Sequence, residues 1–219
     1  MRVIVDGIDV EVPEGATVLE AAKAADRWVP TLCYDDRQDP FGACRVCLVA
    51  TEVAPAGGAG GRAIIPACTT PARDGMVIDT QDPRARRVAG AVVELVLSEL
   101  PEPPAPHTEL AQVAERLEIR QVRWPGKVHA PQPVDDRHPY LAFRHELCIS
   151  CGRCVRACDE VQGTFALTAT GRGFSANVAA GLDEGFRASA CVSCGACADT
   201  CPTDAIDEIS LLALTEVTA

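Results

Sequence analysis

The sequence predicts an α+β protein with a β-grasp domain at its N-terminus, a helical middle segment and a C-terminal part organised around repeated cysteines. Two observations lead to this prediction. Strand and helix signals in the first third follow the order strand, strand, helix, strand. The twelve cysteines fall into two groups, and none lies between Cys68 and Cys148. We therefore expect three parts, at residues 1–80, 81–140 and 141–219.

The first part opens with a hairpin signal. Arg2–Val5 and Ile8–Val12 are short β-prone runs joined by Asp6-Gly7, a dipeptide favoured in two-residue hairpin turns. A helix is expected over Thr17–Ala25. The first residue of this helix and Glu20 form the pattern of a capping box, which satisfies free amides at a helix start.

Further strands are expected at Leu48–Val53, Ala63–Pro66 and Met76–Asp79. The stretch Ala54–Gly61 is rich in glycine, which indicates a hairpin loop. Two strands, a helix and then more strands are typical of a small α+β domain of the β-grasp type.

Two helices are expected in the middle part. Asp82-Pro83 combines a capping carboxylate with a proline at the first helical position, and prolines end this helix after about Leu100. Thr108 is expected to cap the second helix, whose apolar residues fall on one stripe. These are Leu110, Val113, Ala114 and Leu117. Gln121–Tyr140 contains four prolines and reads as an extended linker.

The composition argues against nucleic-acid binding. Lys and Arg number 20 against 31 Asp and Glu, a formal charge of −11, whereas nucleic acid requires a basic face. No targeting signal and no membrane-spanning stretch is recognisable, so we expect a soluble, cytoplasmic protein. Thiols stay reduced in that compartment, and twelve cysteines there indicate metal ligation rather than disulfides.

The last third contains the same cysteine spacing twice, C-x2-C-x2-C-x3-C. Three cysteines within seven residues suit three corners of a [4Fe–4S] cluster, and the remote cysteine of the other repeat supplies the fourth. Structural zinc is the alternative, but it has no need of the third cysteine. The first cluster is assigned to Cys148, Cys151, Cys154 and Cys201, and the second to Cys158, Cys191, Cys194 and Cys197.

The cysteines of the first third have a less regular spacing. The C-x2-C pair, with a distant cysteine on each side, suits a [2Fe–2S] cluster, while zinc or inert buried thiols are the alternatives. Small residues before the pair permit close approach of backbone amides to sulfur. The predicted ligands are Cys33, Cys44, Cys47 and Cys68.

These motifs resemble a known family. The segments "PTLCYDDRQDPFGACRVCLV" and "ACTTPARDGMVI" are similar to the [2Fe–2S] domain of NADH dehydrogenase subunits, of NAD-reducing and iron-only hydrogenases, and of NAD-dependent formate dehydrogenases. The segment from "CISCGRCVRACDEVQGTFALTATGRGF" to "ACVSCGACADTCPTDAI" looks most like the N-terminal region of the formate dehydrogenase catalytic subunit. The resemblance implies a β-grasp [2Fe–2S] ferredoxin-like domain, a helical linker and a two-cluster [4Fe–4S] ferredoxin domain.

Two departures limit what the resemblance implies. Related chains carry a further [4Fe–4S] site with one His and three Cys ligands in the middle, where this chain has no cysteine. His107 is predicted to be a surface residue, and His129, His138 and His145 have no ligand spacing. The chain also ends at Ala219, where the molybdenum or tungsten domain of the family would begin, so no catalytic residue is predicted.

The expected function is transfer of single electrons through three clusters, between a catalytic subunit and a flavin- and NAD(H)-binding subunit of a formate dehydrogenase complex. The alternatives are a relay subunit of a soluble NAD-reducing hydrogenase, with a nickel–iron partner, and a stand-alone ferredoxin-like carrier. Because the middle lacks cysteine, good electronic connection of the two cysteine groups requires folding or a partner's cluster to bridge them.

Overall fold

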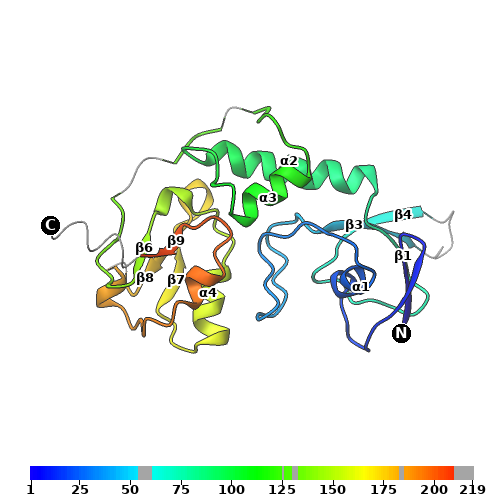
Figure 1. The fold of residues 1–219 in the computed structure, drawn as a ribbon, viewed down its shortest axis with the longest axis horizontal. Helices are drawn as coiled ribbons and strands as arrows, with labels where there is room; N and C mark the ends of the chain where they lie inside the picture. Colours follow the sequence, from blue (N-terminus) through cyan, green and yellow to red (C-terminus); the bar gives the residue numbers. More distant parts are fainter. Residues whose placement is uncertain (54–60, 125, 130–132, 183–184, 210–219) are drawn as a thin grey trace. The chain divides into compact units, whose positions relative to one another are not determined.

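The computed structural model describes residues 1–53, 61–124, 126–129, 133–182 and 185–209 (Figure 1). Contacts divide the chain into two compact units that are described separately. The first unit contains Met1–Tyr34, Pro40–Leu95 and Val113–Trp124. The second contains Asp35–Asp39 together with 96–112 and 125–219.

The first unit is built on a five-stranded sheet in the order β2-β1-β5-β3-β4. Strands β1 and β5 are parallel, and the other neighbours are antiparallel. The strands are β1 (Arg2–Val5), β2 (Ile8–Glu11), β3 (Leu48–Val53), β4 (Gly61–Pro66) and β5 (Val77–Asp79). This mixed sheet with one helix against it confirms the predicted α+β class. Apart from Gly61, the predicted loop Ala54–Gly61 lies outside the described residues.

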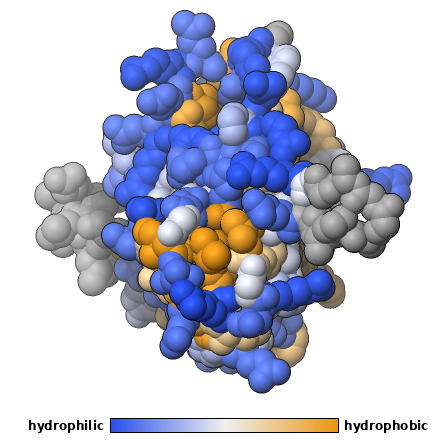
Figure 2. Space-filling view, turned by 90° about the vertical axis from the view of Figure 1, so that its right-hand side faces the viewer, coloured by the Kyte–Doolittle hydropathy of each residue, from blue (hydrophilic) through white to orange (hydrophobic). Residues whose placement is uncertain are grey.

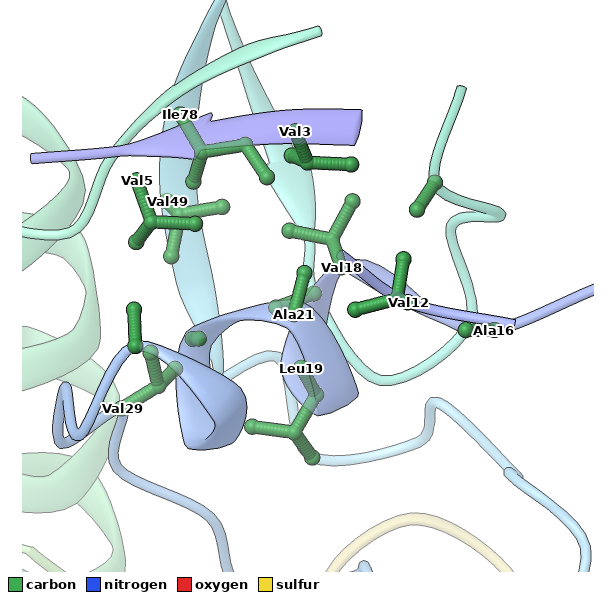
Figure 3. Packing of buried hydrophobic residues seen from close by; sticks show 14 of the residues in the cluster. Val3, Val5, Val12, Ala16, Val18, Leu19, Ala21, Val29, Val49 and Ile78 are labelled. Atoms are coloured by element: carbon green, nitrogen blue, oxygen red, sulfur yellow. The ribbon is translucent and has the colours of Figure 1, made fainter. Parts of the chain in front are cut away.

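Helix α1 (Val18–Ala24) supplies the other layer of this core. Figure 3 shows side chains of the sheet, including Val3 and Ile78, facing the helix that carries Val18 and Ala21. All four are at most 1% exposed, so the apolar face of the helix is fully covered. Burial of such aliphatic side chains is the main source of stability for a unit of this size.

The helix begins where the capping box predicted. The Glu20 amide donates to Thr17 Oγ1 at 3.2 Å, and the Glu20 carboxylate accepts from the Thr17 amide at 2.6 Å. Both groups are thereby paired at the end of a helix that has only 7 residues. A helix this short has little stability of its own and depends on its cap and its packing.

The two middle helices also begin at the predicted residues. Helix α2 (Pro83–Glu99) starts after Asp82, whose Oδ1 accepts from the Ala85 amide at 3.2 Å. Helix α3 (Glu109–Arg116) starts after Thr108, whose Oγ1 accepts from the Ala111 amide at 3.2 Å. The predicted stripe is buried at Leu110, Val113 and Ala114 and half-buried at Leu117.

The second unit contains two small antiparallel sheets, which the sequence analysis did not assign. One pairs β6 (Leu141–Phe143) with β9 (Ile206–Glu208), and the other pairs β7 (Leu167–Thr170) with β8 (Asn177–Ala180). The short helices α4 and α5 span Arg153–Arg156 and Ala196–Asp199. Single turns are formed by His145–Leu147, Ala157–Val161, Gly173–Ser175 and Phe186–Ala188.

The core of the second unit mixes aliphatic, aromatic and cysteine side chains. Phe143, Phe186 and Ile206 pack with Cys154 and Cys158, and all five are at most 8% exposed. These two cysteines are therefore core residues of the unit.

In the predicted linker Gln121–Tyr140, the described residues contain no helix or strand beyond one bridge between Asp135 and Phe143.

One face of the molecule is largely polar. Figure 2 shows that hydrophilic residues predominate on this face and that apolar residues gather at its centre and near its upper edge. The predominance of hydrophilic residues is in keeping with the formal charge of −11. None of the helices in the described part of the chain has the length and apolarity needed to cross a membrane.

The capping box of α1 gives a test of the fold. We expect Thr17→Ala to lower the free energy of unfolding by about 1 kcal/mol, because the Glu20 amide loses its acceptor. Thr17→Ser keeps the hydroxyl and should cost little. Parallel denaturant titrations followed by circular dichroism compare the two variants. Equal losses of stability for Ala and Ser would show that packing of the threonine methyl, and not the cap, is responsible.

Candidate iron–sulfur cluster sites

The two cysteine repeats adopt the same backbone turn. Ser150 and Gly152 of the first repeat have φ of 52° and 79°, and Ser193 and Gly195 of the second have 61° and 77°. Helices α4 and α5 begin directly after the two glycines. Left-handed residues are strained for L side chains, so their recurrence at matching positions indicates a required shape. Three successive cysteines of each repeat line one cavity.

The first repeat forms one wall of a cavity. Cys148, Cys151 and Cys154 line it together with Cys201 from the end of the second repeat. The space amounts to about 320 Å³ including its opening, and apolar side chains such as Phe143 complete the lining. These four are the cysteines assigned by sequence to the first [4Fe–4S] cluster.

The second repeat forms a matching cavity of about 310 Å³. Cys191, Cys194 and Cys197 line it with Cys158, the last cysteine of the first repeat. The structure therefore places each three-cysteine turn beside the remote cysteine of the other repeat. Their ligation of iron stays a prediction, which these positions support.

The charge state of the thiols depends on burial. Burial raises the pKa of Cys151 and of Cys197 to about 12, and it also raises the pKa of Cys148 and Cys154. Because burial disfavours the charged thiolate, these thiols hold their protons. A bound iron centre supplies positive charge, and thiolate ligation then releases those protons.

Hydrogen-bond donors surround several sulfurs. The Ala166 amide donates to Cys158 Sγ at 3.2 Å, and the Ser193 amide donates to Cys191 Sγ at 3.4 Å. The Thr164 hydroxyl lies 3.1 Å from Cys158 Sγ. Such donors stabilise negative charge on cluster ligands and so adjust the reduction potential.

The four cysteines of the first unit lie as two hydrogen-bonded pairs. Cys47 Sγ and Cys68 Sγ are 3.2 Å apart, and the Cys44 amide donates to Cys33 Sγ at 3.4 Å. The bond between the Cys33 and Cys44 thiols raises the pKa of Cys33 and lowers that of Cys44 to about 6. The corresponding bond raises the pKa of Cys47 and lowers that of Cys68.

Backbone shape also matters in this loop. Gly42 has φ of 68°, and a Cβ there would lie 2.8 Å from Thr69 Cγ2. Only glycine combines that conformation with so close an approach. This contact sets the loop before Cys44 against the residue that follows Cys68.

Across the described residues, no group of three or more His, Cys, Asp or Glu side chains is arranged to hold a single metal ion. Cluster ligands bind separate iron atoms, so they need not converge on one point. The fit to [4Fe–4S] clusters is indicated by the two cavities, each lined by four thiols and by apolar residues.

The histidines differ in their placement. His107 is exposed, as predicted, and its Nε2 lies 2.6 Å from Asp204 Oδ2. His138 is buried, and its Nε2 lies 3.8 Å from Cys191 Sγ. The sequence analysis found no ligand spacing around His138 and gave it no role, because Ser193 and Cys191, which its Nε2 approaches, are more than fifty residues away in the chain.

Arg153, between the second and third cysteines of the first repeat, is a buried cation. Its guanidinium donates to both carboxylate oxygens of Glu109 at 2.6 and 2.9 Å, to Thr200 Oγ1 at 2.9 Å and to Asp35 Oδ2 at 3.3 Å. The Asp35 carboxyl also accepts from Arg37, and that bond holds its pKa below the usual range despite burial. Arg153 thereby ties the first cysteine turn to the residue before Cys201.

Both cysteine groups lie within regions that match known families. Residues 1–83 match the 2Fe-2S iron-sulfur cluster binding domain, and residues 147–205 match the 4Fe-4S dicluster domain. The chain is therefore an iron–sulfur protein with a [2Fe–2S] domain followed by a [4Fe–4S] dicluster domain.

Its relatives confirm the resemblance to hydrogenase and NADH dehydrogenase subunits. The chain is 34% identical to NADP-reducing hydrogenase subunit HndD of Solidesulfovibrio fructosivorans, over 95% of this chain and 36% of that protein. It is 29% identical to the NADH-ubiquinone oxidoreductase 75 kDa subunit of Reclinomonas americana, over 94% of this chain and 29% of that protein. The chain thus spans about a third of the length of these relatives.

A solved structure is also similar. A chain in the crystal structure of an NAD+-reducing [NiFe]-hydrogenase in the H2-reduced state superposes with a TM-score of 0.81 at 27% identity. The match covers 96% of this chain and 88% of that chain.

The grouping of thiols around the two cavities predicts crossed ligation. Cys201→Ser should impair the cluster at Cys148, Cys151 and Cys154, whereas Cys158→Ser should impair the cluster at the second repeat. Electron paramagnetic resonance of the reduced variants measures each cluster, with Cys151→Ser and Cys194→Ser assigning the signals. Damage confined to the cluster of the mutated repeat itself would contradict this pairing.

The Arg153 network predicts a large loss of stability on its removal. Arg153→Met leaves the buried Asp35 carboxylate with one cation fewer, and we expect a cost of about 3 kcal/mol, the lower end for breaking a buried ion pair, because Glu109 is half exposed. Guanidinium unfolding followed by circular dichroism and cluster absorbance measures it. Arg37→Met removes an exposed partner of the same carboxylate and should cost less than about 1 kcal/mol. Equal costs would refute a special role for Arg153.

Proposed function

We propose that this chain is an electron-relay subunit that passes single electrons through one [2Fe–2S] and two [4Fe–4S] clusters. The observation that carries the proposal is the arrangement of eight cysteines around two cavities, four to each, beside a match to a dicluster domain. The four cysteines of the first unit fall within the match to a [2Fe–2S] domain. We further propose that residues 1–80 and 141–219 hold these clusters and that residues 81–140 connect them.

The residues of the chain have three tasks in this role. The cysteines hold the clusters, which accept and release one electron each when bound. The apolar lining, including Phe143 and Leu141, keeps water away from them. Backbone amides such as those of Ala166 and Ser193 donate to sulfur and stabilise the added negative charge. Once the clusters are bound, electron transfer through them requires no proton transfer and no bond cleavage by these residues.

The partners we propose are a flavin- and NAD(H)-binding subunit and a metal-bearing catalytic subunit. Similarity to a hydrogenase subunit and to a chain of an NAD+-reducing [NiFe]-hydrogenase favours a hydrogenase partner with nickel and iron. A formate dehydrogenase with molybdenum or tungsten, the first expectation from the motifs, is the second candidate. The charge of −11 suits basic docking surfaces on such partners, in a cytoplasmic setting.

Co-purification distinguishes these possibilities. The chain is isolated from native extract through an affinity tag, and the metals that accompany it are measured. Nickel, together with hydrogen oxidation, would support a hydrogenase partner. Molybdenum or tungsten would support formate dehydrogenase. Recovery of the chain alone would favour a stand-alone carrier and contradict a fixed subunit role.

The isolated chain provides the direct test. Anaerobic reconstitution should incorporate about ten irons per chain, two plus four plus four, following the ligation patterns of its motifs. The protein should then be reducible by dithionite without oxidising formate, hydrogen or NADH, since no catalytic constellation is recognisable. Iron and sulfide analysis and substrate assays measure these outcomes. Saturation near six irons would remove one [4Fe–4S] cluster, and substrate oxidation above a metal-stripped control would refute the relay role.

A further inference from the structure

His138 has a fixed tautomer. Its Nδ1 lies 3.1 Å from the Tyr140 amide and 3.0 Å from the Leu141 amide. Backbone amides only donate, so Nδ1 must accept both bonds with its lone pair. In the neutral imidazole the proton therefore resides on Nε2, which is left as a donor.

That donor is directed at the ligand turn of the second repeat. Nε2 lies 3.0 Å from Ser193 Oγ and 3.8 Å from Cys191 Sγ. The Ser193 amide donates to the same sulfur at 3.4 Å. Two N–H groups, one from the backbone and one from an imidazole, thus approach one predicted cluster ligand.

The imidazole is held in this position by its surroundings. His138 is 4% exposed, and its ring packs edge-on against Phe186 at a centroid distance of 5.8 Å. Together with the two backbone bonds, this contact leaves the ring little freedom to turn away. The donor is therefore preorganised before any cluster binds.

The first repeat has a different neighbour. His145 precedes Cys148 by three residues, but its Nδ1 lies 3.0 Å from Asn177 Nδ2 and its ring packs on Phe143. Among the described residues, His138 is the histidine whose ring nitrogen makes a hydrogen bond to a cysteine sulfur. The two [4Fe–4S] sites are thus unequal in their donors.

We propose that His138 is a positioning residue whose Nε2–H donates to Cys191 Sγ and raises the reduction potential of the second [4Fe–4S] cluster, held by Cys158, Cys191, Cys194 and Cys197. The inference rests on the proposed function. One electron enters the cluster, no proton is taken up and no bond breaks. Added negative charge makes the sulfur a better acceptor, so the hydrogen bond is stronger in the reduced state and favours it.

His138→Asn tests this. The Asn Oδ1 can accept from the amides two and three residues ahead, as in an Asx turn, but the shorter side chain withdraws the donor from Cys191. We expect the equilibrium constant for one-electron reduction of the second cluster to fall about tenfold, a shift of about 59 mV to lower potential. The first cluster should keep its potential. Redox titration of the reconstituted chain, followed by electron paramagnetic resonance, measures both clusters.

Two further variants keep the test decisive. His145→Asn is the matched control and should leave the second cluster unchanged. Ser193→Ala removes the competing oxygen acceptor, so Cys191 Sγ becomes the remaining acceptor for Nε2 and the potential should stay equal or rise. Pulsed electron paramagnetic resonance on protein with 15N-labelled histidine should detect a hyperfine coupling between a histidine nitrogen and the reduced second cluster. This coupling should vanish in His138→Asn.

The outcomes separate this inference from the proposed function. Wild-type protein that assembles no [4Fe–4S] clusters would refute the proposed function itself. Assembled wild-type clusters with an unchanged second potential in His138→Asn, or with equal shifts of both clusters, would refute the role of His138 alone. If His138→Asn does not assemble its clusters, two other results would refute the role of His138. One is the absence of the nitrogen coupling in the wild-type protein, and the other is a lowered potential of the second cluster in Ser193→Ala.

Discussion

The arrangement of the second unit depends most on the hydrogen bonds and ion pairs of the buried Arg153 guanidinium. A charged group that is removed from water must be neutralised by partners in fixed positions. Apolar side chains have no such directional requirement. Arg153 meets this requirement through Glu109 at the start of α3, Asp35, and the hydroxyl of Thr200. Thr200 immediately precedes Cys201. The network therefore holds the first cysteine turn close to Cys201, its remote fourth cysteine, through noncovalent contacts of the protein.

The sequence predicted those parts of the fold whose signals are local. The Asp6-Gly7 turn, the capping box at Thr17 and the Asp82-Pro83 helix start act through neighbours within four residues, so the residues themselves specify the structure. The α+β class of the first unit follows from the order of such elements. The repeated cysteine spacing belongs to the same category, because the turn that it imposes is short.

Other features depend on contacts between distant residues. Strands β6 and β9 have 3 residues each and pair across more than sixty positions, so neither carries a periodic signal of its own. His138 gains its environment from Ser193 and Cys191, and spacing along the chain offers no sign of this. A buried arginine is equally unexpected from composition, since arginine is rarely buried unless it is paired. These residues became recognisable only through geometry.

The short Asp35–Asp39 segment has a consequence for how this protein could be rearranged. It lies between Cys33 and Cys44 in the sequence, yet it belongs to the second unit. Replacing residues 1–80 by another [2Fe–2S] domain would therefore also remove Asp35, and with it one carboxylate that neutralises Arg153. Residues 1–80 therefore cannot be exchanged for another domain without loss of a contact within the second unit. A recombined chain would need an acidic residue at the position of Asp35. The loop between Cys33 and Cys44 would therefore have to be kept intact in any such exchange.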